Sequence, residues 1–114
     1  MSQVTLNIKE IIGTPNAIIQ RLGIQLFEYA YPLLSSGKYL VLDFSGITNL
    51  TSGFCNASIG QLYSSFPQIA SSHIQISNID EGSIWMEKIN ESIILATNPE
   101  KAEQIDSSIL ALFE

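Results

Sequence analysis

The side chains that could take part in chemistry are concentrated in one stretch of the sequence, residues 43 to 56. The stretch begins with a carboxylate, Asp43, and continues with hydroxyl, amide and glycine residues suited to hydrogen bonding. Ser52 is the sharpest candidate, because it is expected at a helix N-terminus, where a phosphate on its hydroxyl would be tolerated or stabilising. The candidate partner-binding residues around it are Asp43, Ser45, Gly46, Thr48, Asn49, Thr51, Gly53 and Asn56.

Two roles are open for Ser52, which is expected at an exposed helix start. A phosphate there would lie among free backbone N–H groups at the positive end of the helix dipole, and its charge could displace a docked partner. Alternatively, Thr51 or Ser52 is only the N-cap, whose side-chain oxygen accepts a hydrogen bond from the first turn and contributes about 1 kcal/mol.

The sequence offers little support for an enzyme. Asp43 has no second carboxylate, histidine or lysine at a nearby position to complete an acid-base pair, so we expect it to brace the Ser45–Gly46 turn. Cys55 is expected to be a small core residue with little thiolate character. One cysteine and one histidine leave no Cys/His zinc site, and there is no Walker loop or dinucleotide fingerprint. No catalytic residue, metal or cofactor is expected.

Length and charge narrow the class of protein. The 114 residues are enough for one domain with a single core, which we place at residues 1–114. The formal net charge of -6 argues against binding to nucleic acid or an anionic membrane, because both need clustered Lys and Arg. No apolar stretch approaches a membrane span and no secretory signal is apparent, so a soluble, cytoplasmic protein is expected.

The first third of the chain predicts a strand followed by a helix. Residues 4 to 8 alternate between apolar and polar, as in a strand near the edge of a sheet. Thr14 is then expected as an N-cap with Pro15 in the first helical position, and Pro32 should kink or end that helix near Tyr31. Gly37 is a plausible terminator. The predicted buried face of the helix is Ile18, Leu22, Leu26, Tyr29 and Leu33.

The rest of the chain predicts two more strands and three helices. Tyr39–Phe44 is a nearly continuous apolar run, expected as a central parallel strand covered on both faces. A helix over Ser52–Phe66, a strand at 74–76, a helix from Asp80 and a last helix over Pro99–Phe113 follow from the spacing. The expected fold is α/β, with a small mixed or mostly parallel sheet of three to four strands backed by four helices. The apolar stripes of these three helices are predicted as Cys55, Ile59, Leu62 and Phe66; Trp85, Ile89, Ile93 and Ala96; and Ala102, Ile105, Ile109 and Leu112.

The stretches Asp43-Phe44-Ser45-Gly46-Ile47 and Leu50-Thr51-Ser52-Gly53-Phe54 resemble the signature of STAS domains, the fold of bacterial anti-sigma factor antagonists. They are more similar still to the STAS-like family of unknown function, with its LDF-x-G stretch followed by S-x-F at a helix start. Thr51 and Gly53 depart from the antagonist pattern, which has an acidic residue and a second serine there.

The resemblance implies that Ser52 corresponds to the serine that a partner kinase phosphorylates. It also implies a non-enzymatic regulatory domain that binds a protein partner, such as a histidine-kinase-like ATPase or another anti-sigma-factor-type regulator. The alternative is a structural module that forms a homodimer through its C-terminal helix, over Pro99–Phe113. An exposed Ser52 favours the first hypothesis, and an apolar outer stripe on the last helix favours the second.

Overall fold

The computed structural model describes residues 2–80 and 82–97, and its centre is a parallel sheet of three strands in the order β1-β3-β5. The strands are β1 (Gln3–Asn7), β3 (Tyr39–Asp43) and β5 (Ile74–Ser77). Both strand pairs are parallel, and the register aligns Val4, Leu40 and Ile74 across the sheet. The predicted α/β class and the central position of the Tyr39 strand are confirmed.

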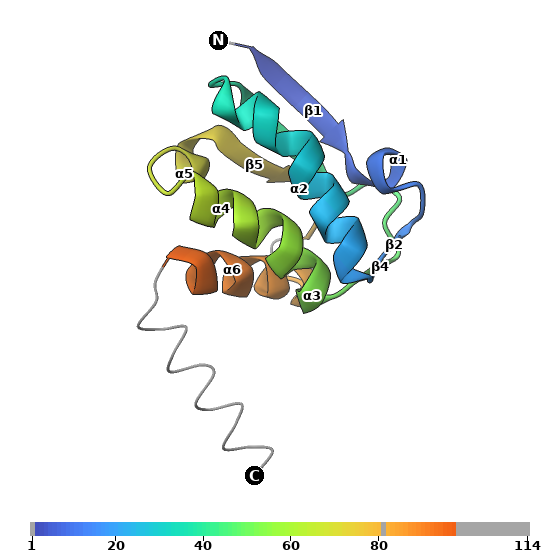
Figure 1. Cartoon of the computed structure of the whole chain (residues 1–114). Coiled ribbons are helices and arrows are strands. Elements are labelled where there is room, and N and C mark those ends of the chain that lie inside the picture. Colours follow the sequence, from blue (N-terminus) through green and yellow to red (C-terminus); the bar gives the residue numbers. More distant parts are fainter. Residues whose placement is uncertain (1, 81, 98–114) are drawn as a thin grey trace.

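Helices α2 (Gln20–Ser35) and α6 (Ile84–Thr97) flank a continuous helical segment between them (Figure 1). That segment runs from α3 (Ser52–Cys55) through a π-helical turn, η1 (Asn56–Gly60), to α4 (Gln61–Ser65). Of the two shorter helices, α1 (Ile8–Ile12) connects β1 to the next strand, and α5 (Ala70–His73) lies between α4 and β5.

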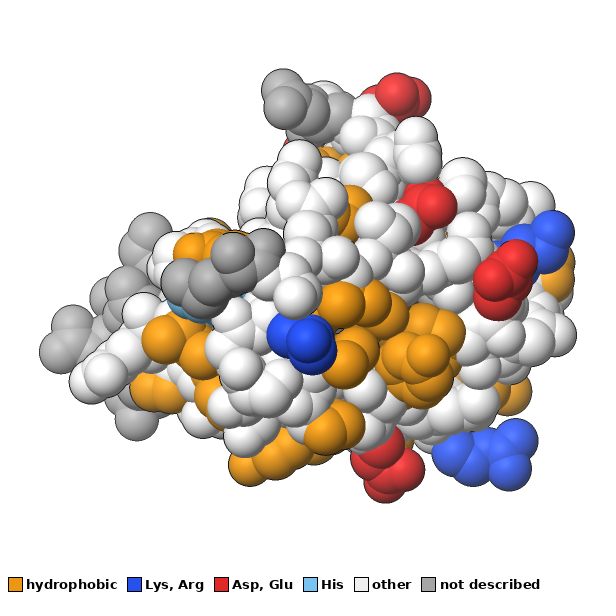
Figure 2. Space-filling model, turned by 90° about the horizontal axis from the view of Figure 1, so that it is seen from above, with side chains coloured by type: hydrophobic (Ala, Val, Ile, Leu, Met, Phe, Trp, Pro, Cys, Tyr) orange, Lys and Arg blue, Asp and Glu red, His pale blue; other side chains and the backbone are white. Residues whose placement is uncertain are grey.

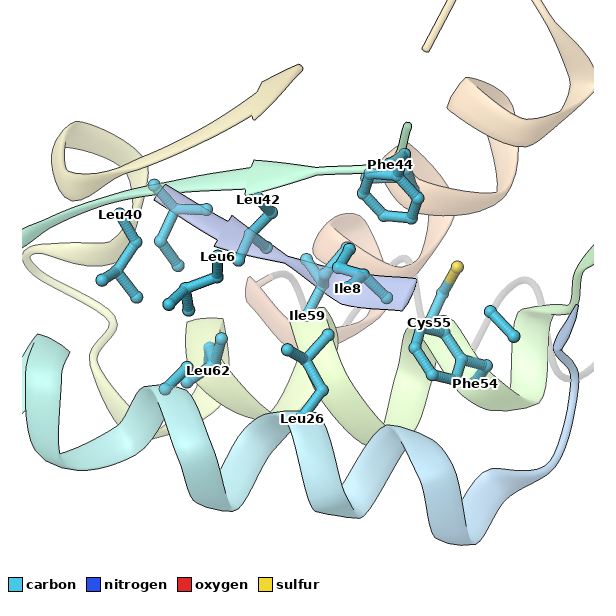
Figure 3. Close-up of a cluster of buried hydrophobic side chains, with 14 of the residues drawn as sticks. Leu6, Ile8, Leu26, Leu40, Leu42, Phe44, Phe54, Cys55, Ile59 and Leu62 are labelled. Atoms are coloured by element: carbon cyan, nitrogen blue, oxygen red, sulfur yellow. The ribbon is translucent and has the colours of Figure 1, made fainter. Parts of the chain in front are cut away.

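The core lies between the sheet and these helices. Figure 3 shows Leu6, Leu40 and Leu42 pointing from the strands toward Leu26, Ile59 and Leu62 of the helices. All six side chains are buried, and each such side chain contributes about 1.5–3 kcal/mol through removal from water.

Within residues 2–80 and 82–97, the helices cover one face of the sheet, whereas the expectation was that β3 is covered on both. Burial alternates along β3, so that Leu40 and Leu42 are buried while Val41 is half-buried. On the face that carries Val41, its neighbours in register are Thr5 and Gln75, and both are exposed. An apolar run of this length is therefore compatible with a two-layer arrangement.

The first strand ends one residue earlier than the alternation predicts, because Asn7 begins a helix. Its side-chain oxygen accepts a hydrogen bond from the Glu10 N–H at 2.9 Å, which caps α1. Gly13 ends α1 with a φ of 77°, and its N–H donates to the Lys9 carbonyl. Helix α1 was not predicted, although the Asn7-x-x-Glu10 spacing is typical of a helix start and could have indicated it.

The prediction that Thr14 and Pro15 start a helix is wrong. Residues there form the short strand β2 (Asn16–Ala17), which pairs in parallel with β4 (Asn49–Leu50). The Pro15 carbonyl accepts the Thr48 N–H at 2.8 Å, while Thr14 Oγ1 accepts only the Asn16 N–H in a local turn. This pairing across the chain holds the backbone extended and delays the helix to Gln20.

Helix α2 also differs from its prediction in the face that it buries and in its end. Its buried residues are Gly23, Leu26, Ala30 and Leu34, whereas Tyr29 is 54% exposed and Ile18, outside the helix, is 45% exposed. Leu22 and Leu33 are half-buried. The helix continues through Pro32 to Ser35, and Gly37 follows with the expected positive φ of 86°.

The prediction for the helix after Ser52 is confirmed over Ser52–Ser65, with Cys55, Ile59 and Leu62 buried; Phe66, just past the helix end, is half-buried. The strand at 74–76 is confirmed as well. Helix α6 begins at Ile84 and not at Asp80, because Ser83 Oγ accepts the Met86 N–H at 3.2 Å. The helix expected over Pro99–Phe113 lies outside the described residues.

Two helices approach unusually closely at Gly23. A Cβ built there would lie 2.6 Å from the Phe54 carbonyl oxygen and 2.9 Å from the Ala57 Cβ. The first of these neighbours is backbone, which cannot move aside without displacing α3. A glycine is therefore required for α2 to seat against the helix that begins at Ser52.

We expect Gly23→Ala to lower the free energy of unfolding by about 1–3 kcal/mol, because overpacking outweighs the helix propensity gained, which is about 1 kcal/mol. Gly53→Ala is the matched control, since only Thr51 Oγ1 lies within 4 Å of a Cβ there, at 3.9 Å. Urea denaturation of both variants measures the difference; equal stabilities would show that the helices are not in tight contact.

Candidate functional site

The Asp43 carboxylate lies at the carboxyl end of the sheet and bonds to groups that follow each of the three strands. Asn78, just after β5, donates from Nδ2 to Oδ1 at 2.6 Å, and Asn7, at the end of β1, donates to Oδ2 at 3.4 Å. Ser45 donates twice, from its backbone N–H at 2.9 Å and from its hydroxyl at 3.1 Å. The network also accounts for the φ of 59° at Asn78, since its side chain must reach Asp43.

This network lowers the pKa of Asp43. The hydrogen bond from Asn78 is the largest cause, followed by the backbone bond from Ser45, and burial opposes them only in part. A carboxylate that accepts several hydrogen bonds favours its charged form. Asp43 therefore braces the turn as an ionised acceptor, as its position at the end of an apolar strand predicts.

The turn that follows presents Ser45 and Gly46 to solvent. Gly46 has a φ of 81°, a backbone conformation that residues other than glycine rarely adopt. A Cβ at this position would lie 2.9 Å from Lys9 Cδ and 3.5 Å from Lys9 Nζ. The aliphatic chain of a lysine thus covers the glycine, and its ammonium group is at the edge of the turn.

Thr48 and Asn49 are exposed but are held by the strand β2. The Asn49 side chain donates to the Asn16 Oδ1 at 2.6 Å, and Thr48 Oγ1 lies 3.4 Å from both the Pro15 carbonyl and that same oxygen. Lys88 Nζ donates to the Leu50 carbonyl at 3.1 Å from the other side. The loop is therefore anchored along its length.

The helix start is capped by Thr51. Its Oγ1 accepts the Phe54 N–H at 3.2 Å and donates to the Ile18 carbonyl at 2.7 Å, so one hydroxyl serves both the cap and the connection to β2. Ser52 is the first residue of α3, and its side chain and Gly53 are exposed. Of the two candidate caps, Thr51 has that role, and Ser52 is left free for another.

The candidate residues thus divide into two groups. The first group forms hydrogen bonds that shape the loop and consists of Asp43, Ser45, Thr48, Asn49 and Thr51. The second group lies on the exposed surface and consists of Gly46, Ser52 and Gly53. Asn56 is exposed, but its Oδ1 accepts a 2.6 Å hydrogen bond from Ser92 of α6, which directs it toward that helix. Residues 45–53 therefore form one continuous and largely exposed segment, which we call the candidate surface, and Asn56 lies just beyond its end.

Sequence reasoning missed three contributors to this surface. Lys9 and Lys88 come from distant parts of the chain and bring positive charge to a loop in an acidic protein. Ile19, which is 55% exposed, follows Ile18, whose carbonyl bonds to Thr51. Separate contacts from distant parts of the chain bring these three residues to the loop, so no local pattern could have indicated them.

Other chemistry finds little support in the described residues. Burial raises the pKa of the Cys55 thiol to about 12, against a smaller opposite effect of Lys88, so Cys55 is a core residue as predicted. Within residues 2–80 and 82–97, no group of three or more His, Cys, Asp or Glu side chains is placed to hold a metal ion. Among the same residues, no helix has the length and apolar composition needed to cross a membrane.

Asp43→Asn should lower the free energy of unfolding at pH 7 by about 1–2 kcal/mol, a value reduced by the partial exposure of the site. Because the pKa of Asp43 is lower in the folded state, its contribution is present above the ordinary pKa of 3.8 and disappears as the pH falls through the folded value. Urea denaturation from pH 7 to pH 2 should therefore show the two proteins converging in acid. A constant difference at every pH would contradict this role.

Thr51→Ala should cost about 1 kcal/mol through loss of the N-cap, whereas Ser52→Ala should change stability by less than about 0.5 kcal/mol. This replaces the expectation that Ser52 itself contributes as a cap. Thermal unfolding of the two variants beside Thr51→Ser, which keeps the hydroxyl, distinguishes them. A larger loss at Ser52 would reverse the assignment.

Comparison with known protein families gives one match. Residues 23–83, more than half of the chain, match the model of the STAS-like domain of unknown function (DUF4325). No curated protein and no solved structure matches the chain. The matched range includes the Asp43 turn, the capped helix start and strand β5, whereas Asn7, strand β2 and Lys88 lie outside it. The chain belongs to the family of STAS-like domains of unknown function.

Proposed function

We propose that this protein is a regulatory domain that binds another protein through the surface formed by residues 45–53, and that phosphorylation of Ser52 controls the binding. The observation that carries the proposal is the exposed Ser52 hydroxyl in the first turn of a helix whose N-cap is already supplied by Thr51. A residue that is not needed for the cap can be modified without loss of the fold.

The charge and shape of the surface support a protein partner with an acidic contact region. Lys9 and Lys88 lie at the turn and at Leu50, while the chain as a whole carries a net charge of -6. Ile19 adds an apolar contact beside the helix start. Apolar residues surrounded by polar groups are typical of protein interfaces, and complementary charge selects the partner.

Phosphorylation would act on this surface by local electrostatics. A phosphate on Ser52 adds nearly two negative charges next to free N–H groups of the first turn, which the helix dipole tolerates. The same charge would repel an acidic partner and compete for the two lysines. The resemblance to anti-sigma factor antagonists suggests a histidine-kinase-like ATPase as partner and kinase, and a bacterial cytoplasm as the place of action.

Ser52→Asp should leave the melting temperature unchanged and should prevent recovery of the partner, whereas Ser52→Ala should keep both the fold and the partner. The measurement is affinity capture from cells of the source organism with each variant as bait, followed by binding titration with the recovered protein. Ser71→Asp, an exposed serine in α5, is the matched control for added charge. Equal binding by the Asp and Ala variants would overturn the proposal.

A further inference from the structure

Helix α2 carries a second stripe of apolar side chains beside the face that it buries in the core. Ile24 and Tyr31 are each 43% exposed and Phe27 is half-buried, at a spacing that places all three on one face of the helix. Tyr31 lies between Phe27 and Phe66: its ring is edge-to-face with Phe27, with centroids 5.4 Å apart, and tilted against Phe66, with centroids 5.0 Å apart. The stripe is therefore a pre-ordered aromatic and aliphatic surface.

A shallow hollow of about 290 Å³ lies beside this stripe, between α2 and the η1 segment. Its lining is Gln20, Ile24, Phe27, Ala57 and Gln61, with no charged side chain. Figure 2 looks onto the end of the molecule at which α2 terminates, and hydrophobic side chains gather there between few, widely spaced charges. Such a surface favours an apolar protein contact.

The charged residues at the border of the stripe indicate which partner this face binds. Arg21 and Glu28 are both exposed and lie on the same side of α2, seven residues apart. Two turns separate them by about 10 Å along the axis, too far for a direct pair within one helix. In an antiparallel pair of α2 helices related by a two-fold axis between positions 24 and 25, each Arg21 faces Glu28 of the other copy.

We propose that the protein forms a two-fold symmetric dimer through this face of α2, with the two Ile24 side chains adjacent across the axis and the Arg21–Glu28 pairs at its border. A two-fold interface must be complementary to itself, and this face meets the requirement in charge because it carries both Arg21 and Glu28. The hollow beside Ile24 provides room for Ile24 of the second copy. This contact differs from the dimer expected from the C-terminal helix, and it does not depend on Ser52.

The test is sedimentation equilibrium of the full chain with charge-reversal variants. Arg21→Glu and Glu28→Arg should each weaken the dimer at least about tenfold, because each substitution places two like-charged contacts in the interface. The double variant Arg21→Glu/Glu28→Arg should recover the dimerisation constant to within about threefold. Failure of the double variant to recover would overturn the α2 dimer.

Two substitutions that leave the charge unchanged test the apolar part of the interface. Ile24→Gln should also weaken the dimer about tenfold or more, since its partner is a second apolar side chain. Ile84→Gln is the matched control, because Ile84 is 68% exposed on α6, outside the α2 face. Circular dichroism should show both folded. A wild-type chain that is monomeric at high micromolar concentration, or a dimer that Ile24→Gln leaves unchanged, would contradict the proposal.

Discussion

The Asp43 carboxylate ties together the carboxyl ends of the three parallel strands, and the placement of the exposed surface depends on it. Parallel strands end side by side, so one acceptor at the end of the central strand can collect donors from both neighbours. Asn78 and Asn7 supply these donors, and Ser45 closes the turn on the same group. Without an ionised acceptor, four donors would meet an uncharged side chain.

From this fixed turn the chain is held until the helix begins. The β2–β4 pairing anchors Thr48 and Asn49, and Thr51 connects the helix start to Ile18. Gly23 then lets α2 approach the Phe54 carbonyl, which fixes the direction of the helix after Ser52. Contacts of these other residues thus hold the surface in place. The Ser52 side chain takes no part in them.

The sequence was informative where burial follows a local period. Alternation along β1 and β5 and the 3.6-residue stripe of Cys55, Ile59 and Leu62 predict their elements correctly, because each has one face toward the core. Helix α2 misled the prediction because apolar residues occur both on its buried face and beside it. Strands of two residues, as in β2 and β4, have no detectable period, so their pairing could come only from the tertiary structure.

The candidate surface likewise contains residues that the sequence could indicate and residues that only the tertiary structure reveals. Its exposed residues follow one another along the chain and could be named from sequence, while the lysines and the isoleucine that flank them are distant in sequence. Which of Thr51 and Ser52 is the cap could not be decided either, since both have hydroxyls. Contacts of the Thr51 hydroxyl with Ile18 and Phe54, from segments on either side, decide it.

The most direct measurement of this account is amide hydrogen exchange by NMR in Asp43→Asn at pH 7. If the carboxylate holds the surface in place, exchange should accelerate most at the amides of Ser45, Ile47 and Thr51, while those of Leu40 and Leu42 in the core strand stay protected. Uniform acceleration throughout the chain, or no change in the loop, would contradict the claim that Asp43 positions the Ser52 surface.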